Sequence, residues 1–204
     1  MLKLYQDPRS GNCYKATLTA SHLGIPLHTV DVDVMSGFTR EQDFLKKNPN
    51  GRVPTLELEN GTFLPESNAI IWYLAEGSPL IPVTKIARAQ MLQWMFFEQY
   101  SHEPYIAVAR FWLTFVSPEK RKDRLHLLPE WHAKGNAALS VMEQHLTANQ
   151  WFAGNQFSLA DIALYAYTHC AEDGGFNLKD FPKILAWISR VEGTHGFTPM
   201  AGSS

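Results

Sequence analysis

The stretch VPTLELENGTFL, residues 53–64, decides the fold of the first part of the chain. Apolar and acidic residues alternate before Asn60 and Gly61, and apolar residues return after them. An Asn-Gly pair between two such runs is the strongest short signal of a two-residue β-hairpin. Pro54 stands where the first run begins, one of the few strand positions that tolerate the loss of a backbone donor. The stretch therefore predicts two antiparallel strands entered through a proline.

The sequence around this hairpin switches between strand and helix periodicity. Residues 2–5 (LKLY) and 29–34 (TVDVDV) alternate, which predicts strands, whereas apolar residues between 16 and 23 recur at helical spacing until a glycine stops them. A short helix is predicted at 41–47, and Ile70, Tyr73 and Leu74 mark another. The order β-α-β-α-β-β-α combines a parallel pair with an antiparallel hairpin. We therefore predict an α/β thioredoxin-like domain with a mixed four-stranded sheet over residues 1–76.

The second half of the chain carries only helical patterns. The segment GSPLIP lies in a predicted linker, 77–84, and residues 85–204 are predicted to form an all-α domain. Side chains from Met91 to Phe97 are apolar nearly all round, which predicts a helix buried on more than one side, and Pro104 should interrupt it. Ser158 and Asp161 have the spacing of a capping box. The last predicted helix has an apolar face made of Phe181, Ile184, Leu185 and Ile188.

Composition restricts the classes of function. A net charge of -2 with both signs interspersed offers no basic face for nucleic acid or an anionic membrane. The start of the chain has no apolar signal region, and no stretch approaches the ~20 apolar residues of a membrane span, so we expect a cytoplasmic protein. Cys13 and Cys170 are expected to be reduced thiols. His102-Glu103 lacks the second histidine of a zinc-protease helix, so no metal site is expected.

Two further stretches carry groups that suit an anionic ligand. In LPESNAI, Glu66 and Ser67 stand where a helix begins, so Ser67 could hold a carboxylate while Glu66 pairs with an ammonium. In DPRSGNCYK, Ser10 or Asn12 faces the positive end of the following helix. The alternative for both stretches is an ordinary turn followed by a helix cap.

Together, the stretches NPNGRVPTL, PESNAIIWYL and FSLADIAL, in this order, resemble the glutathione transferases, and the resemblance covers essentially the whole chain. It implies a cis peptide bond before Pro54, with the backbone of Val53 pairing with the cysteinyl part of glutathione. The resemblance also assigns roles to side chains. The hydroxyl of Ser10, helped by Asn12, would stabilise the glutathione thiolate; Glu66 and Ser67 would bind the γ-glutamyl end, and Arg52 and Arg40 the glycyl carboxylate.

The chain departs from several classes of this family. Tyr5 lies in the first strand and Tyr14 in the first helix, so neither is placed like a catalytic tyrosine, and the bacterial serine-type, theta- or beta-like classes are the closer match. Cysteine-type members have a thiol where Ser10 stands. Cys13 comes three residues later, and its alternatives are a role in the site or a small apolar residue under the sheet.

The resemblance implies a transferase that directs the glutathione thiolate to an apolar electrophile, and a homodimer. Glutathione would be the co-substrate, with no metal. Aromatic side chains of the helical half would line the electrophile pocket, or else belong to the core or a dimer contact: Tyr105, Phe111 and Trp112. Two alternatives remain open: glutathione-dependent reduction of disulfides or peroxides in the same site, and a non-catalytic interaction module on the same fold.

Overall fold

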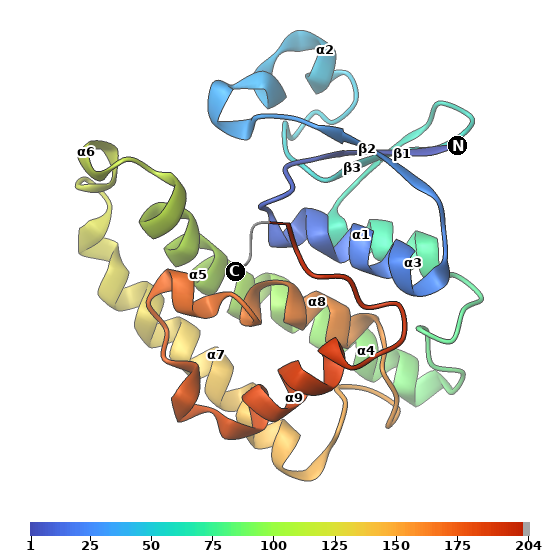
Figure 1. Ribbon diagram of the computed structural model, residues 1–204, viewed down its shortest axis with the longest axis vertical. Helices are drawn as coiled ribbons and strands as arrows, with labels where there is room; N and C mark the ends of the chain where they lie inside the picture. The colour runs from blue at the N-terminus through green and yellow to red at the C-terminus, as the bar shows by residue number, and fades with distance from the viewer. Residues whose placement is uncertain (202–204) are drawn as a thin grey trace. The chain divides into compact units, whose positions relative to one another are not determined.

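The structure is a computed structural model that describes residues 1–201; residues 202–204, the end of the predicted helical domain, lie outside the described residues. The chain divides into two compact units, one formed by Met1–Ser78 together with the segment from Thr194 onward, the other by Pro79–Gly193 (Figure 1). The C-terminal segment thus groups with the first unit, although its sequence continues the helical half.

The first unit contains the predicted mixed four-stranded sheet. Its strands are β1 (Leu2–Gln6), β2 (Leu27–Asp31), β3 (Thr55–Glu57) and β4 (Phe63–Pro65), in the order β2-β1-β3-β4. β1 pairs in parallel with β2, and the other two pairs are antiparallel. The connection from β1 to β2 crosses over through a helix, as a parallel pair requires.

Helices cover this sheet on both sides (Figure 1). α1 (Gly11–Leu23) and α3 (Ser67–Ala75) lie on one side, where Leu4, Leu56 and Ile70 are fully buried between sheet and helices. On the other side, the short helix α2 (Gln42–Leu45) brings Phe44 against Tyr5 and Val32. Two single 3₁₀ turns, η1 (Val34–Ser36) and η2 (Phe38–Arg40), precede α2.

Two predicted details of this unit are wrong. The hairpin loop is longer than two residues, because the Gly61 N–H donates to the Leu58 carbonyl (2.9 Å), and Gly61 alone takes the left-handed conformation (φ 82°). Glu59 and Asn60 are therefore the central turn residues, with glycine in the position that needs positive φ. The second strand ends at Asp31 rather than at residue 34, since the Asp33 side chain accepts from the Met35 N–H (2.8 Å) and starts a 3₁₀ turn.

In the second unit, the described residues form helices and turns, with one isolated bridge. The α-helices are α4 (Lys85–Phe97), α5 (Glu103–Arg110), α6 (Pro118–Arg121), α7 (Leu128–Ala148), α8 (Leu159–Thr168) and α9 (Pro182–Glu192). Two π-helical segments, η3 (Glu98–His102) and η4 (Phe111–Phe115), flank α5. The other short turns are η5 (Leu125–Leu127), η6 (Ala171–Gly174) and η7 (Leu178–Asp180).

The predicted helix signals of this unit are confirmed in part. Ser158 and Asp161 form the capping box at the start of α8, and Pro104 stands in the first turn of α5, directly after the interruption. The prediction that α4 is buried on more than one side is wrong for Phe96, whose side chain is 69% exposed. The predicted face of α9 is wrong at one position, since Trp187 is fully buried and Leu185 is exposed.

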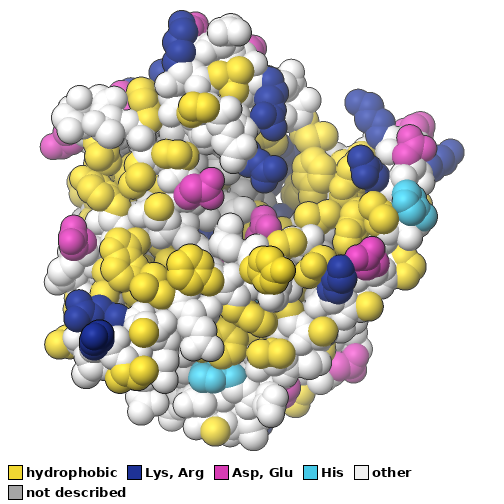
Figure 2. Space-filling view, turned by 180° about the vertical axis from the view of Figure 1, so that it is seen from behind, with side chains coloured by type: hydrophobic (Ala, Val, Ile, Leu, Met, Phe, Trp, Pro, Cys, Tyr) yellow, Lys and Arg dark blue, Asp and Glu magenta, His cyan; other side chains and the backbone are white. Residues whose placement is uncertain are grey.

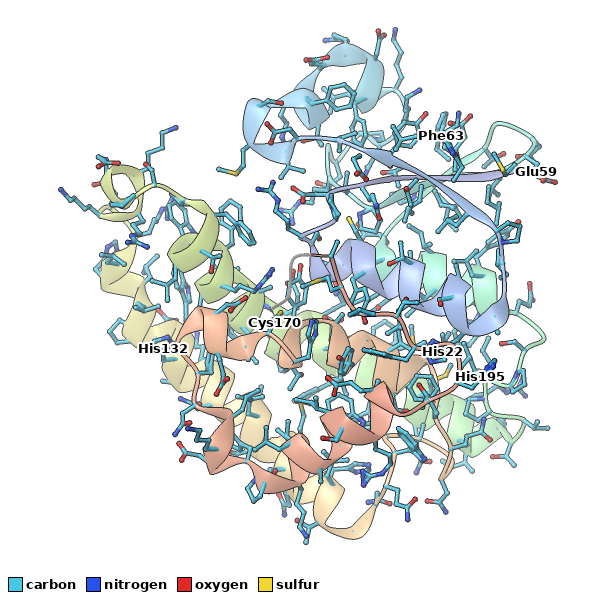
Figure 3. The ribbon with its side chains drawn as sticks, viewed as in Figure 1. His22, Glu59, Phe63, His132, Cys170 and His195 are labelled. Carbon is cyan, nitrogen blue, oxygen red and sulfur yellow. The ribbon has the colours of Figure 1, made fainter. Side chains whose placement is uncertain are left out.

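The segment after Thr194 packs along α1. The Ser21 hydroxyl donates to the Gly196 carbonyl (2.7 Å) and the Tyr14 hydroxyl to the Thr198 carbonyl (2.6 Å). A side chain at Gly196 would lie 2.7 Å from the His22 Cα, so glycine is required there. His22 and His195 mark this contact in Figure 3.

The surface shows no segregation of charge on the face seen in Figure 2, where acidic and basic side chains lie interspersed among hydrophobic ones. None of the helices within residues 1–201 combines the length and the apolar character that a membrane crossing requires.

Candidate active site

Strand register brings three loops to one end of the sheet. Tyr5 near the end of β1 lies opposite Thr55 at the start of β3, and Thr55 lies opposite Pro65 at the end of β4. The segments that follow β1, precede β3 and follow β4 therefore meet at the same sheet end. They carry seven of the predicted glutathione-site residues: Ser10, Asn12, Arg52, Val53, Pro54, Glu66 and Ser67.

The loop after β1 is shaped by an ion pair. The Arg9 guanidinium donates to both carboxylate oxygens of the buried Asp7 (2.9 and 2.7 Å), and the Arg9 N–H donates to Asp7 as well (3.0 Å). This turn places Ser10 as the N-cap of α1, where its hydroxyl oxygen accepts the Cys13 N–H (3.4 Å). Because accepting uses a lone pair, the Ser10 hydroxyl proton remains available for a ligand.

The neighbouring thiol and phenols are occupied or buried. Burial raises the pKa of the Cys13 thiol to about 12, and the side chain has no solvent exposure. Burial and the hydrogen bond to Glu57 (2.8 Å) raise the pKa of Tyr5 to about 12. The Tyr14 hydroxyl is bound to the C-terminal segment. Cys13 is thus a buried small residue, and Ser10 is the hydroxyl that the helix start presents.

The loop before β3 is organised by Asn48, which sequence reasoning missed. The Val53–Pro54 peptide bond is cis. The buried Asn48 amide donates to the Arg52 carbonyl (2.8 Å) and to the Thr55 hydroxyl (3.2 Å), and its oxygen accepts the Asn50 N–H (3.0 Å). Its sequence signal is weak, because asparagine before a proline and a glycine reads as an ordinary turn.

The loop after β4 joins the Ser10 loop through side chains. Glu66 is exposed and holds a positive φ (71°), unusual outside glycine. Ser67, the first residue of α3, donates its hydroxyl proton to the Asn12 side-chain oxygen (3.1 Å). The buried Lys15 ammonium donates to the same Ser67 oxygen (3.3 Å). Lys15 was also missed; its only signal is a lysine within an otherwise apolar or small-residue helix.

The two predicted arginines differ in how they are held. The Arg40 guanidinium donates to the Asn50 carbonyl (3.0 Å) and lies over Gly51, where an added Cβ would be 2.8 Å from Arg40 Nη1. The Arg52 side chain is exposed, and only its carbonyl is tied into the Asn48 network. Arg52 belongs to the loop that leads to Val53, and Arg40, the last residue of η2, is hydrogen-bonded to that loop.

Of the three predicted pocket aromatics in the second unit, the structure brings two together. Phe111 and Trp112 both belong to the π-helical η4, with ring centroids 6.0 Å apart. Tyr105 lies earlier, on α5, where the Lys134 ammonium is 5.1 Å from its ring centroid.

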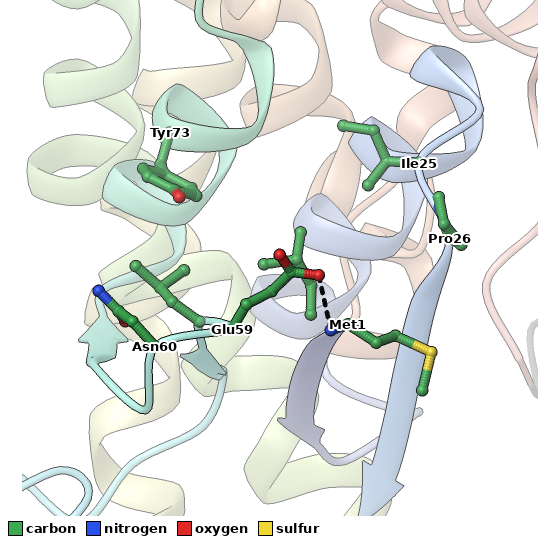
Figure 4. Close-up of a pocket in the computed structure, with 8 residues that line it drawn as sticks. Met1, Ile25, Pro26, Glu59, Asn60 and Tyr73 are labelled. Carbon is green, nitrogen blue, oxygen red and sulfur yellow. Dashed lines mark ion pairs between the residues drawn. The ribbon is translucent and has the colours of Figure 1, made fainter.

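A pocket of about 640 Å³ lies at the opposite end of the sheet from these loops (Figure 4). It is lined by residues from the start of β1, the segment just before β2, the hairpin loop and α3, and none of them is a predicted site residue. The Met1 ammonium and Glu59 pair across its edge (2.6 Å). Among the described residues, no group of three histidine, cysteine, aspartate or glutamate side chains is arranged to hold a metal ion.

Comparison with known proteins finds glutathione transferases that match this chain over nearly its whole length. A glutathione S-transferase from Pseudomonas fluorescens Pf-5 superposes with a TM-score of 0.94 at 49% identity, covering 98% of each chain. Glutathione S-transferase 3 of Zea mays is 34% identical over 205 residues, 96% of this chain and 91% of that protein. A glutathione transferase from Phanerochaete chrysosporium, solved with oxidised glutathione, has a TM-score of 0.83 at 25% identity, covering 96% of this chain and 90% of that one.

Two family definitions match separate parts of the sequence. Residues 9–76 match "Glutathione S-transferase, N-terminal domain", and residues 106–194 match "Glutathione S-transferase, C-terminal domain". The first match contains all seven residues at the sheet end described above. The chain belongs to the glutathione S-transferase family.

Proposed function

We propose that the protein is a glutathione transferase that binds glutathione at the sheet end formed by the Ser10, Val53 and Glu66 loops. The observation that carries the proposal is the 3.1 Å hydrogen bond between Ser67 and Asn12. This hydrogen bond joins Ser67, which is predicted to bind the γ-glutamyl end of glutathione, to Asn12, which is predicted to help Ser10 stabilise the thiolate. The Phanerochaete transferase, bound to oxidised glutathione, supports a ligand of this class.

Thiolate activation is the chemical contribution proposed for Ser10. A free thiol with a pKa near ~8.5 is only a few per cent ionised at neutral pH. Lowering that pKa by ~2 units requires ~2.7 kcal/mol of preferential thiolate stabilisation. The Ser10 hydroxyl, the Asn12 amide and the N-terminus of α1 together supply about this amount. The thiol proton leaves to solvent, and the thiolate forms a C–S bond with an electrophilic carbon, either displacing a leaving group with its electron pair or adding to a polarised double bond whose other end takes up a proton.

The remaining parts of the site follow the family pattern. Val53 would offer backbone groups to the cysteinyl residue, Glu66 would pair with the γ-glutamyl ammonium, and Arg40 and Arg52 would meet the glycyl carboxylate. The electrophile is proposed to contact aromatic side chains of the helical unit: Tyr105, Phe111 and Trp112. We also propose a homodimer and a cytoplasmic location.

Glutathione-dependent disulfide reduction is the second candidate, favoured by the oxidised glutathione bound to the Phanerochaete relative. Ser10 stands where a redox thiol would be needed, and burial raises the pKa of Cys13 to about 12. The thiols would therefore come from glutathione itself, one attacking the substrate disulfide and a second releasing oxidised glutathione. A non-catalytic module is the third possibility.

Titration with reduced glutathione, followed by ultraviolet absorbance of the bound thiolate across pH, tests the proposal. We expect saturable binding, a thiolate midpoint below pH 7, and an increase of that midpoint by roughly 1–2 pH units in Ser10→Ala with affinity nearly unchanged. Absence of binding at millimolar glutathione would reject both enzymatic candidates and favour the module.

A matched cap variant separates chemistry from helix capping. Ser10→Ala also removes a helix cap, which costs about 1 kcal/mol of stability. Thr84→Ala removes a comparable cap, since Thr84 accepts the Ala87 N–H (3.2 Å) at the start of α4. The Thr84 variant should leave the thiolate midpoint unchanged. An unchanged midpoint in Ser10→Ala would transfer the role to Asn12.

A further inference from the structure

Lys15 is a charged side chain buried without any solvent exposure on α1, which packs against α3. Taking an ammonium out of water is costly, and apolar replacements of buried charges are often neutral or stabilising. Packing therefore gives no reason for a lysine at this position rather than a methionine. A use for the charge has to be found among its neighbours.

The Lys15 ammonium starts a directed chain of hydrogen bonds. An ammonium can only donate, so the Ser67 oxygen, 3.3 Å away, must accept from it. The single hydroxyl proton of Ser67 then points to the Asn12 side-chain oxygen, 3.1 Å away. Lys15 thus fixes the orientation of the Ser67 hydroxyl and, through it, the side chain of Asn12.

The position of Ser67 makes this chain relevant to an anion. Ser67 is the first residue of the nine-residue α3, where helix N–H groups and the helix dipole already favour negative charge. The Lys15 ammonium, 3.3 Å from the Ser67 hydroxyl oxygen, adds a positive charge next to that point. Because the Ser67 hydroxyl proton is already donated to Asn12, a carboxylate at this point would accept from the N–H groups of the helix start and be attracted by the ammonium, whereas a neutral group of the same shape would gain little from either.

We propose that Lys15 is a positioning residue that gives the subsite at the start of α3 its preference for a carboxylate, acting through its charge next to Ser67 without touching the ligand. The inference rests on the proposed function, under which this group is the α-carboxylate of the γ-glutamyl residue. Lys15 therefore determines selectivity for the γ-glutamyl end of glutathione.

The test compares two ligands that differ only in that group. Glutathione and γ-aminobutyryl-cysteinylglycine, which lacks the α-carboxylate, are titrated calorimetrically into wild-type protein, Lys15→Met and Lys46→Met. Lys46 is an exposed lysine of the same unit, paired with Asp43 (2.8 Å), so its variant controls for the loss of one positive charge. We expect Lys15→Met to bind glutathione about tenfold more weakly and the carboxylate-free ligand as wild type does.

The outcomes separate this inference from the proposed function. If Lys15→Met binds both ligands more weakly by the same factor, or keeps the wild-type ratio of the two affinities, the role of Lys15 is overturned, while glutathione binding by the wild type stands. Failure of the wild type to bind glutathione overturns the proposed function and this inference with it. If Lys15→Met does not fold, Lys15→Gln is measured with the same two ligands, because it keeps a donor but removes the charge, and the same preference criterion decides.

Discussion

Replacement of Asn48 by alanine should lower both the free energy of unfolding of the first unit and the affinity for glutathione. The Asn48 side chain is 3% exposed and makes three hydrogen bonds, at 2.8, 3.2 and 3.0 Å, to the loop that ends at Val53–Pro54. A buried hydrogen bond contributes about 1 kcal/mol net. The Thr55 hydroxyl still donates to the Arg52 carbonyl (3.1 Å) without Asn48, so two of the three partners keep a hydrogen bond and the Asn50 N–H loses its acceptor. We therefore expect a loss of about 2–3 kcal/mol.

Two measurements follow from this estimate. Urea unfolding should show a lower midpoint, and thermal unfolding should shift down by roughly 4–12 °C if the chain unfolds in one transition. Affinity for glutathione should fall by about tenfold or more, because the Val53 backbone must be reordered when the ligand binds.

Asn60→Ala provides the matched control. Asn60 also accepts a backbone N–H, from Thr62 (3.0 Å), but it is exposed in the hairpin loop at the other end of the sheet. It should cost less than about 1 kcal/mol and leave glutathione affinity unchanged. The reasoning fails if Asn48→Ala is no more destabilising than Asn60→Ala. A stability loss with unchanged affinity would restrict Asn48 to folding.

Three further outcomes test other parts of the structure. Burial raises the pKa of Cys13 to about 12 and that of Cys170 to about 11. A thiol reagent at pH 8 should therefore label neither cysteine in the native protein and both in denaturant, as detected by mass spectrometry. Rapid labelling of Cys13 in the native protein would contradict this prediction. Burial also raises the pKa of Asp161 to about 7, so the folded state favours its protonated form. The stabilisation of the folded state that comes from this raised pKa is complete below pH ~4 and is lost as the pH rises toward 7. The unfolding free energy of the wild type relative to Asp161→Asn should therefore decrease between these pH values. A difference that does not change with pH would refute this prediction. If exposed Phe96 lies in a dimer contact, Phe96→Glu should lower the sedimentation mass to that of a monomer, whereas Val83→Glu, at a position 89% exposed, should not.

Element order could be predicted because each signal is local. The β-α-β-α-β-β-α order, the C-cap at Gly24 and the capping box at Ser158 all depend on residues within one or two turns of each other. Errors arose where a local pattern had two solutions. Asn60-Gly61 fits a two-residue turn, but also a turn with glycine one position later, and only the pairing of Glu57 with Phe63 decides between them.

The residues that organise the candidate site could not be found in the same way. Lys15 and Ser67 are 52 positions apart in sequence, and the buried amide of Asn48 finds its partners at Arg52 and Thr55 only when the loop before β3 folds around it. Amphipathic patterns treat a lysine or asparagine as a surface residue. Trp187 was missed for a related reason, since its indole donates to Asp161 (3.0 Å), a partner on another helix.

A common physical arrangement connects the site loops to the core. Ser10, Val53 and Glu66 stand on loops, yet each loop is held by a buried polar group behind it: Asp7 for the first, Asn48 for the second and Lys15 for the third. Loops alone would be too mobile to hold hydrogen-bond donors in place, and ordering them on binding would weaken affinity. Polar groups buried for this purpose lower the stability of the empty protein relative to apolar ones. Lys15→Met is therefore expected to bind glutathione less well without a loss of thermal stability. If the role of Lys15 were purely structural, its replacement would lower the thermal stability as well.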